Sequence, residues 1–268
     1  MKTWGKIKEA AQSAWGWVRG REEPDSAIPG EVSISQRNGV RYLTLGTEWI
    51  QGAMLVARPD EIELEYARRM MGWMLFESNP SLIVQMGLGG GALAKFCLRH
   101  FPRAELEVIE IDASVARACH DWFSLPRPSA QFRLVIGDAL AYALDPSAHG
   151  RADVLQVDVY DAYADGPAVG SASFYQGCFD CLAPGGWMCV NLFGDHPGFT
   201  GQYGDIKRIF GRALTLGRLG SGNVVVMARK GSIDFDMVSI EESARTIERA
   251  MGMAVGSWVD DLRSQNRS

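Results

Sequence analysis

The sequence predicts an α/β protein in which a small antiparallel sheet precedes a doubly wound sheet. Two observations indicate this fold. Residues 81–112 follow the pattern strand, glycine turn, helix, strand, which is typical of a nucleotide-binding βαβ unit. Further along, short apolar runs alternate with helical patterns, as expected where helices connect the strands of a doubly wound sheet.

The amino-terminal part is expected to form a helix, a linker and a small sheet. Residues 1–20 place apolar side chains at helical spacing among basic ones, so we expect a helix packed on the body or on a partner subunit. An interfacial membrane helix and a disordered segment are the alternatives. Residues 21–30 contain two prolines and predict a linker. Alternating apolar residues over 31–57, interrupted by Asn38-Gly39, predict a hairpin sheet.

The rest of the chain is expected to alternate helices and strands. Residues 59–77 predict one helix that begins at Pro59. The expected strands of the main sheet are 82–86, 106–111, 132–136, 152–159 and 187–192. Helices are expected around 93–97 and at 114–123, 139–144, 173–182 and 204–212. An antiparallel pair at the sheet edge (214–219 and 223–229) and closing helices (240–262) complete the prediction.

Composition narrows the class of protein. The 268 residues carry a net charge of -5 and are 47% hydrophobic, so nucleic acid is not indicated as the main partner. No apolar run approaches the roughly 18 residues of a membrane span. Five cysteines without a secretory leader predict reduced thiols and a cytoplasmic protein. Cys178 and Cys181 are expected to be buried thiols, and no metal site is expected.

Polar residues follow successive strands and predict one cleft, because the carboxyl ends of the strands of a doubly wound sheet share an edge. The glycine turn offers Gly87, Gly89 and Gly91 for close approach of a ligand to the backbone. Glu110 is placed to accept hydrogen bonds from two ribose hydroxyls, and Asp138 from an adenine amine. These residues suit an adenosine-containing ligand, which need not carry phosphate, because the turn departs from the dinucleotide pattern and the absence of a Walker pattern counts against ATP.

A second acidic motif follows the predicted strand 152–159. Asp158 and Asp161 lie three residues apart, and Tyr160 and Tyr163 alternate with them. Two carboxylates between aromatic walls can bind a cationic amine by charge and cation–π contact. One carboxylate can also take a proton as the amine attacks a carbon. The alternative is that one acid caps a turn and the other is solvated.

Together these motifs resemble the spermidine synthase (polyamine aminopropyltransferase) family, nearest to its spermidine synthase-like branch. The resemblance runs from about Tyr42 to Gly231. It rests on Gly87–Gly91, Glu110-Ile111-Asp112, Gly137-Asp138, Asp158 to Asp161, Gly166-Pro167 and Phe174-Tyr175, in that order. It implies a doubly wound sheet of the S-adenosylmethionine-dependent methyltransferase type, and a role in polyamine biosynthesis.

The resemblance also implies roles for single residues. Asp158 would be the general base, Asp161 would hold the amine substrate, and Tyr66 and Tyr163 would line its site. Gln51 would lie on the side of the co-substrate, which the family takes as decarboxylated S-adenosylmethionine.

Three positions depart from the family pattern. Gly90 is assigned to the position where the family carries an aspartate that pairs with the aminopropyl end of the donor. Ala67 replaces a histidine or glutamine, and Asn191 replaces a glutamine after the fifth strand. Loss of the aspartate weakens the case for the decarboxylated donor, and it removes a carboxylate that would repel intact S-adenosylmethionine.

Three functions remain open at this point: an aminopropyltransferase acting on a polyamine-type amine, a methyltransferase using intact S-adenosylmethionine, and a nucleoside-binding homologue without turnover. We also expect a homodimer. The predicted organisation is an amino-terminal helix and linker (1–30), a small β-hairpin domain (31–58) and a Rossmann-like S-adenosyl-ligand-binding domain (59–268).

Overall fold

The computed structural model describes residues 30–160, 171–217 and 222–266. The predicted helix at 1–20 and most of the predicted linker lie outside the described residues. In the described part of the chain, no helix is both long enough and apolar enough to cross a bilayer.

A small antiparallel sheet opens the described chain, as predicted. Its strands are β1 (Val32–Arg37), β2 (Val40–Leu45) and β3 (Ile50–Leu55), in the order β1-β2-β3. Asn38 and Gly39 connect the first two with φ values of 52° and 78°. Positive φ at both positions is the geometry of the tight turn that matches the twist of two paired strands. The strand β3 lies against α3 (Ala92–His100) of the main domain, and β1 lies against α4 (Ala113–Trp122).

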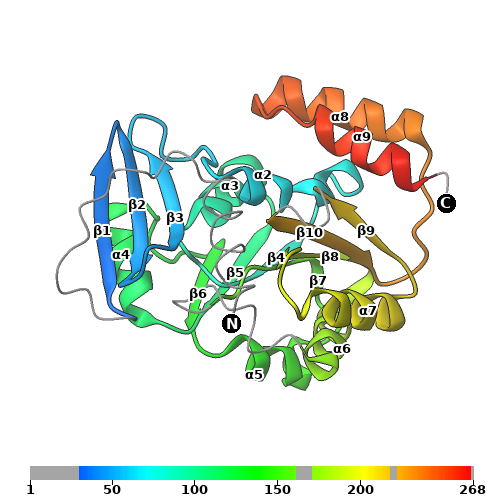
Figure 1. Cartoon of the computed structure of the whole chain (residues 1–268), viewed down its shortest axis with the longest axis horizontal. Coiled ribbons are helices and arrows are strands. Elements are labelled where there is room, and N and C mark those ends of the chain that lie inside the picture. The colour runs from blue at the N-terminus through cyan, green and yellow to red at the C-terminus, as the bar shows by residue number, and fades with distance from the viewer. Residues whose placement is uncertain (1–29, 161–170, 218–221, 267–268) are drawn as a thin grey trace.

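The main sheet has seven strands in the order β6-β5-β4-β7-β8-β10-β9 (Figure 1). The strands are β4 (Leu82–Met86), β5 (Glu105–Glu110), β6 (Phe132–Ile136), β7 (Ala152–Val157), β8 (Leu182–Phe193), β9 (Ala213–Leu216) and β10 (Asn223–Arg229). From β6 to β8 all pairs are parallel, whereas β10 is antiparallel to both β8 and β9. The chain order reverses at β4, so the crevice in which such sheets bind ligands lies at its carboxyl end.

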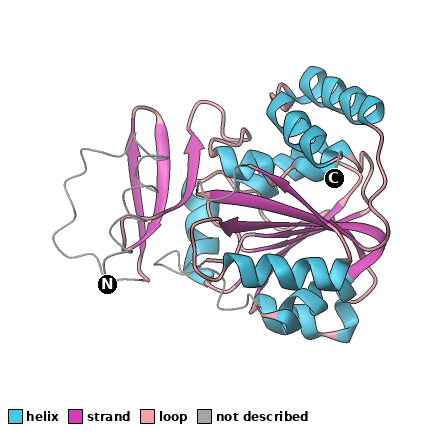
Figure 2. Ribbon diagram, turned by 45° about the vertical axis from the view of Figure 1, so that its right-hand side comes forward, coloured by secondary structure: helices cyan, strands magenta, loops and turns pink. Residues whose placement is uncertain are grey.

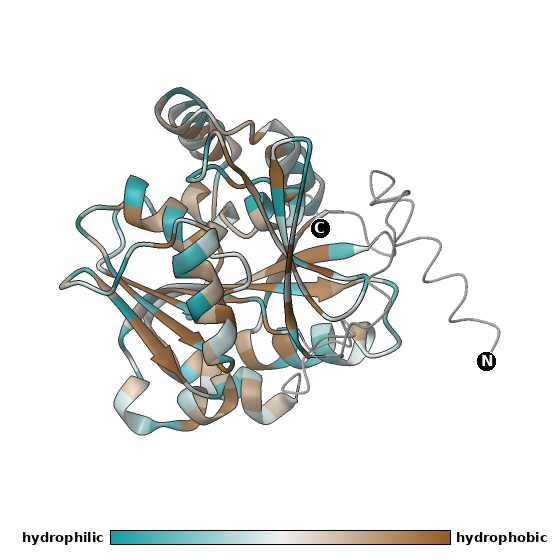
Figure 3. Cartoon of the chain, turned by 90° about the vertical axis from the view of Figure 1, so that its left-hand side faces the viewer, coloured by the Kyte–Doolittle hydropathy of each residue, from teal (hydrophilic) through white to brown (hydrophobic). Residues whose placement is uncertain are grey.

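Helices cover both faces of this sheet (Figure 2). One apolar cluster joins the sheet to α3 (Ala92–His100), α4 (Ala113–Trp122), α8 (Met237–Met251) and α9 (Gly256–Gln265). The other cluster joins it to α5 (Ala139–Leu144), η2 (Pro146–Ala148), α6 (Ala172–Cys181) and α7 (Phe199–Phe210). The strands between these layers are coloured mostly as hydrophobic (Figure 3). The prediction of a doubly wound α/β fold is confirmed.

The predicted helix at 59–77 is wrong in its extent. The structure has only α2 (Glu65–Arg69) and a 3-10 turn, η1 (Gly72–Leu75). The six residues 70–75 are all buried, so no single helical stripe describes them. A Cβ on Gly72 would lie 2.3 Å from the Leu216 side chain of β9. Packing against the sheet therefore overrides the local helical pattern.

The strand pair at 214–219 and 223–229 is confirmed as antiparallel, with one difference. The strand β10 lies between β8 and β9, so only β9 forms the sheet edge. This arrangement brings the first residue of β10 beside the last residue of β8, because Asn223 pairs with Phe193.

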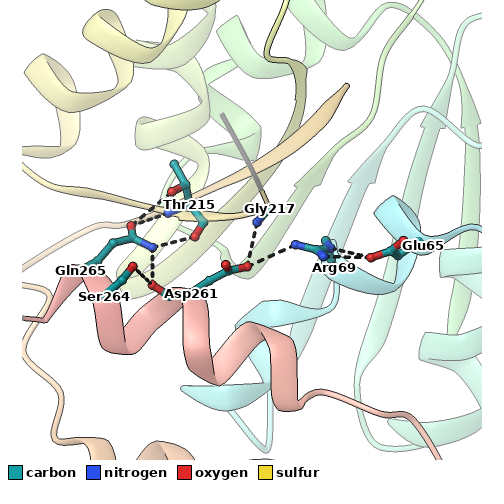
Figure 4. A network of polar contacts seen from close by, with 7 residues as sticks. All are labelled: Glu65, Arg69, Thr215, Gly217, Asp261, Ser264 and Gln265. Atoms are coloured by element: carbon teal, nitrogen blue, oxygen red, sulfur yellow. Dashed lines mark hydrogen bonds and ion pairs between the residues drawn. The ribbon is translucent and has the colours of Figure 1, made fainter. Parts of the chain in front are cut away.

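The helix α9 covers the open edge of β9 (Figure 4). The side chain of Gln265 accepts a hydrogen bond from the Thr215 backbone N–H at 2.8 Å and donates one to the Thr215 carbonyl at 2.8 Å. Asp261 accepts from the Gly217 N–H at 2.9 Å and pairs with Arg69 at 3.2 Å. The glutamine amide thus forms hydrogen bonds with backbone groups of β9 to which another strand could otherwise pair.

Replacing Gln265 with alanine is expected to lower the free energy of unfolding by about 1–3 kcal/mol, because donors and acceptors of the edge strand lose their partners. Urea unfolding of the two proteins measures this difference. Gln176→Ala on the exposed face of α6, where the side chain donates a hydrogen bond to Asp180 at 3.1 Å, is the matched control. Equal losses in the two variants would contradict the role of Gln265 at the edge.

Candidate active site

A cavity of about 350 Å³ opens at the carboxyl ends of the parallel strands. The small sheet forms one wall, through β2, β3 and the segment between them, and the glycine turn and strand ends form the other. From the small sheet and α2 the lining includes Leu43, Leu45, Trp49, Ile50, Gln51 and Tyr66. From the main sheet it includes Gly87–Gly89, Ile109–Asp112, Gly137–Ala139, Asp158–Tyr160, Asn191, Phe193 and Asn223. Eight of the ten residues predicted for the site are in the described chain, and seven of these line this cavity.

The glycine turn is compressed between two backbone segments. Gly87 has φ +89°, and a Cβ there would lie 2.1 Å from the carbonyl oxygen of Asp158. Gly89 has φ +52°, and a Cβ there would lie 2.6 Å from the carbonyl oxygen of Gln51. Both positions therefore require glycine for conformation and for space. The turn can pack this closely only because Gly87 and Gly89 have no side chains.

Gly90 and Gly91 do not line the cavity. A Cβ on Gly90 would point at Gly52 of β3, 3.1 Å from its Cα, and a Cβ on Gly52 would lie 2.3 Å from the Gly90 nitrogen. Gly91 has φ +69° at the start of α3 and faces Leu125. The expectation that Gly90 is the position facing the donor is thus corrected: Gly89 lines the cavity instead. Contact with β3 leaves no room for an acid at Gly89, and at Gly90 a side chain requires Gly52 to move by a few tenths of an ångström.

Glu110, the last residue of β5, is buried and ties the turn to the sheet. Its carboxylate accepts hydrogen bonds from the backbone N–H of Leu88 at 2.9 Å and of Asp112 at 2.8 Å. Burial raises the pKa of Glu110, and these backbone hydrogen bonds oppose the rise. Each carboxylate oxygen keeps a second lone pair, which ribose hydroxyls can use.

Asp138 and Asp112 each cap a helix at the cavity wall. Asp138 accepts from the Leu140 N–H at 2.6 Å, and Asp112 accepts from the Ser114 N–H at 2.7 Å. Aspartate is a favoured residue at a helix N-terminus because its side chain satisfies an unpaired N–H. The cap fixes the Asp138 carboxylate in the wall of the cavity, beside Gly137.

Asp158 is the centre of a hydrogen-bond network. It follows β7, and its carboxylate accepts from Asn191 Nδ2 at 2.9 Å and from the Tyr66 hydroxyl at 3.3 Å. Tyr160 donates to the Asn191 carbonyl at 2.6 Å, and Asn223 donates to Asn191 Oδ1 at 3.0 Å. Tyr66, predicted for the amine site, therefore contacts the carboxylate predicted to be the general base.

Burial raises the pKa of Asp158, and the hydrogen bonds from Asn191 and Tyr66 oppose this rise. Burial also raises the pKa of Tyr66, and the nearby Asp158 charge adds to the effect. Tyr66 is thus a hydrogen-bond donor at neutral pH. A carboxylate with a raised pKa accepts a proton more readily than one exposed to water.

The described lining of the cavity carries one sign of charge. It contains the carboxylates of Glu110, Asp112, Asp138 and Asp158 and, within the described residues, no lysine, arginine or histidine. In a cavity with apolar walls these charges act on a ligand through a lower dielectric than water. The lining therefore favours a cationic ligand.

Asp161 and Tyr163 lie outside the described residues, so their predicted roles stay predictions. Conversely, sequence reasoning missed Trp49, Phe193 and Asn223 as lining residues. The signal for Asn223 was its place at the start of a strand antiparallel to its neighbour. The first residue of an antiparallel strand lies at the carboxyl edge of its parallel neighbours. This could be recognised for Asn223 only after the structure showed that β10 pairs with β8.

The cysteines of the described chain are buried thiols. Burial raises the pKa of Cys181 to about 11 and that of Cys178 well above its ordinary value. Within the ranges that the structure describes, no group of three His, Cys, Asp or Glu side chains is arranged to hold a metal ion.

The chain resembles known proteins in sequence and in fold. No protein-family model matches the chain. It is 30% identical over 251 residues to a polyamine aminopropyltransferase of Chromobacterium violaceum, covering 93% of this chain and 95% of the relative. A probable spermidine synthase of Corynebacterium glutamicum has a similar fold, with a TM-score of 0.67 at 17% identity over 80% of this chain and 83% of that one. Human methyltransferase-like protein 13 in complex with SAH gives a TM-score of 0.62 at 24% identity over 72% of this chain and 95% of that one.

The fold is therefore the methyltransferase-like α/β fold, preceded by a small antiparallel sheet. By its similarity along almost its whole length to the Chromobacterium protein, the chain belongs to the polyamine aminopropyltransferase family and is a transferase.

Proposed function

We propose that this protein transfers an aminopropyl group from decarboxylated S-adenosylmethionine to a polyamine-type amine. The observation that carries the proposal is the anionic lining with Asp158 at its centre. The decarboxylated donor is a dication, with a sulfonium and an ammonium. Intact S-adenosylmethionine adds a carboxylate, and no described lining residue has a positive side chain to pair with it.

The binding roles follow the positions of the residues. Glu110 accepts from the ribose hydroxyls and Asp138 from the adenine amine. Gln51, Gly87 and Gly89 lie along the donor, where the bare backbone of the turn allows close approach. Gly91 supports this turn from behind rather than touching the ligand. Asp161 and Tyr163 are proposed to bind the far end of the amine substrate.

Asp158 is proposed as the general base, with Tyr66 beside it. The amine nitrogen attacks the aminopropyl carbon bonded to the sulfonium sulfur. The carbon–sulfur bond breaks with its electron pair on sulfur, and methylthioadenosine is released. The nitrogen gains a bond and loses a proton, which the Asp158 carboxylate accepts. Proton transfer of this kind contributes about 10²–10⁴-fold to rate.

A second candidate is methyl transfer from intact S-adenosylmethionine. One observation favours it: the turn carries glycine at Gly89 and Gly90, and contact of Gly89 with β3 excludes an acid there that would repel the carboxylate of that donor. This reaction would release S-adenosylhomocysteine in place of methylthioadenosine.

Calorimetric titration with both donors separates these candidates. We expect at least about tenfold tighter binding of the decarboxylated donor, or about 1.4 kcal/mol, because the carboxylate enters an anionic cavity. Methylthioadenosine, which carries neither the ammonium nor the carboxylate of the donors, is the control for the nucleoside part of the site. Equal or tighter binding of intact S-adenosylmethionine would contradict the proposal and support methyl transfer.

A further inference from the structure

Three side chains form a chain of hydrogen bonds from β10 through β8 to Asp158. Asn223 Nδ2 lies 3.0 Å from Asn191 Oδ1, and Asn191 Nδ2 lies 2.9 Å from Asp158 Oδ1. Asn223 begins β10, and Asn191 lies near the end of β8. Neighbouring strands therefore hold the two amides next to each other at the edge of the cavity.

The donor and acceptor groups fix the direction of each hydrogen bond in this series. An ionised carboxylate only accepts hydrogen bonds, so Asn191 must present its NH₂ group to Asp158. Its carbonyl oxygen then faces the other way and needs a donor, which Asn223 supplies. A rotated Asn191 amide would place oxygen against the carboxylate and NH₂ against NH₂. The hydrogen bonds to Asp158 and from Asn223 are therefore both formed in only one orientation of the Asn191 amide.

The backbone of Asn191 is held as well. Its carbonyl accepts from the Tyr160 hydroxyl at 2.6 Å, and the residue pairs with Val225 across the ladder to β10. Asn191 is 2% exposed, so water has little access to replace a missing partner. The backbone of Asn191 is therefore held in place, and the hydrogen bond from Asn223 restrains the rotation of its side-chain amide.

We infer that Asn223 is a positioning residue: it fixes the Asn191 amide so that its NH₂ group holds one oxygen of Asp158. The inference rests on the proposed role of Asp158 as the base. Asn223 also lines the cavity, but it acts on the carboxylate through Asn191. The hydrogen bond from Asn191 opposes the rise in the pKa of Asp158 that burial causes. Loss of Asn223 should therefore raise this pKa further.

Other ionisable groups face the same cavity and must be followed in any titration. Tyr66 on α2 donates directly to Asp158, and Tyr160 lies on the same segment as Asp158. The remaining ionisable groups in the described lining are Glu110, Asp112 and Asp138, at the ends of β5 and β6.

Carbon-13 NMR of protein labelled at the aspartate carboxyl carbons tests the inference without any substrate. The Asp158 signal is the one missing from the Asp158→Asn spectrum. Asn223→Asp keeps the size of the side chain but replaces the donor with a negative charge, and we expect it to raise the pKa of Asp158 by about one unit or more. Asn223→Ala removes the donor without adding charge, and we expect a smaller rise in the same direction.

Asn79→Asp is the matched control for the change of charge. Asn79 is exposed before β4, at the opposite end of the strands from the cavity, and it pairs with Arg103 at 2.7 Å. The Asn79→Asp variant should leave the pKa of Asp158 unchanged. A pKa of Asp158 that is the same in wild type and both Asn223 variants would overturn the inference, whatever the variants do to stability.

The same variants separate this inference from the proposed function. The acid limb of the pH profile of kcat should move upward together with the NMR titration. If Asp158→Asn keeps full turnover, the proposed base is wrong, although the NMR titration still decides whether Asn223 positions the carboxylate. If Asp158→Asn is inactive and neither the NMR titration nor the acid limb moves in the Asn223 variants, only the positioning role fails.

Discussion

Replacing Asp158 with asparagine is expected to lower kcat for amine-dependent release of methylthioadenosine by about 10²–10⁴-fold, because the proton acceptor is lost. Methylthioadenosine itself should bind as in wild type, since Asp158 is not proposed to contact the nucleoside. The measurements are kcat by product formation and affinity by calorimetry. Unchanged kcat would remove Asp158 from the mechanism.

The pH dependence of wild-type kcat follows from the same residue. The base must be ionised, and burial raises the pKa of Asp158, so activity should fall as the pH drops through that raised value. Stability changes in the opposite sense. A folded-state pKa above the unfolded value means that ionisation of Asp158 costs stability as pH rises. Asp158→Asn should therefore require at least as much denaturant as wild type to unfold at neutral pH. This measurement separates loss of activity from loss of fold.

Gly87→Ala is expected to lower the free energy of unfolding by about 3–5 kcal/mol, combining backbone strain with a clash. The added Cβ would meet the Asp158 carbonyl oxygen at 2.1 Å, and φ is +89°. Because the obstacle is backbone, relief requires movement of the segment that carries Asp158. Chemical denaturation measures the loss, and kcat of the folded fraction should fall with it.

Gly150→Ala is the matched control for this prediction. Gly150 has φ +71° with nothing within 4 Å of the added Cβ, so only conformational strain remains, at about 1 kcal/mol. A loss in Gly87→Ala no larger than in Gly150→Ala would show that the close contact between the turn and Asp158 is not needed.

The fold was largely predictable because its strongest signals are local. Alternation of apolar residues in the small sheet and the glycine turn after β4 each specify their own geometry. The helix at 59–77 was not predictable in extent, because residues 70–75 are buried on all sides by contacts far away in sequence. Local periodicity does not contain that information.

The site shows the same division. Glu110 and Asp158 could be predicted as lining residues, because Glu110 ends one parallel strand and Asp158 directly follows another. Gly90 could not be interpreted from the turn alone, since its constraint is Gly52, thirty-eight positions earlier in the chain. Asn223 required the strand order of the sheet. Residues that act through contacts between distant strands are visible only once those strands are placed.

Product analysis of wild-type protein supplied with putrescine and either donor is the most direct test of aminopropyl transfer. With decarboxylated S-adenosylmethionine, mass spectrometry should find methylthioadenosine and an amine that has gained one aminopropyl group, and Asp158→Asn should form neither. With intact S-adenosylmethionine, no transfer is expected. A methylated amine with S-adenosylhomocysteine, or no product from any polyamine and either donor, would contradict the proposed function.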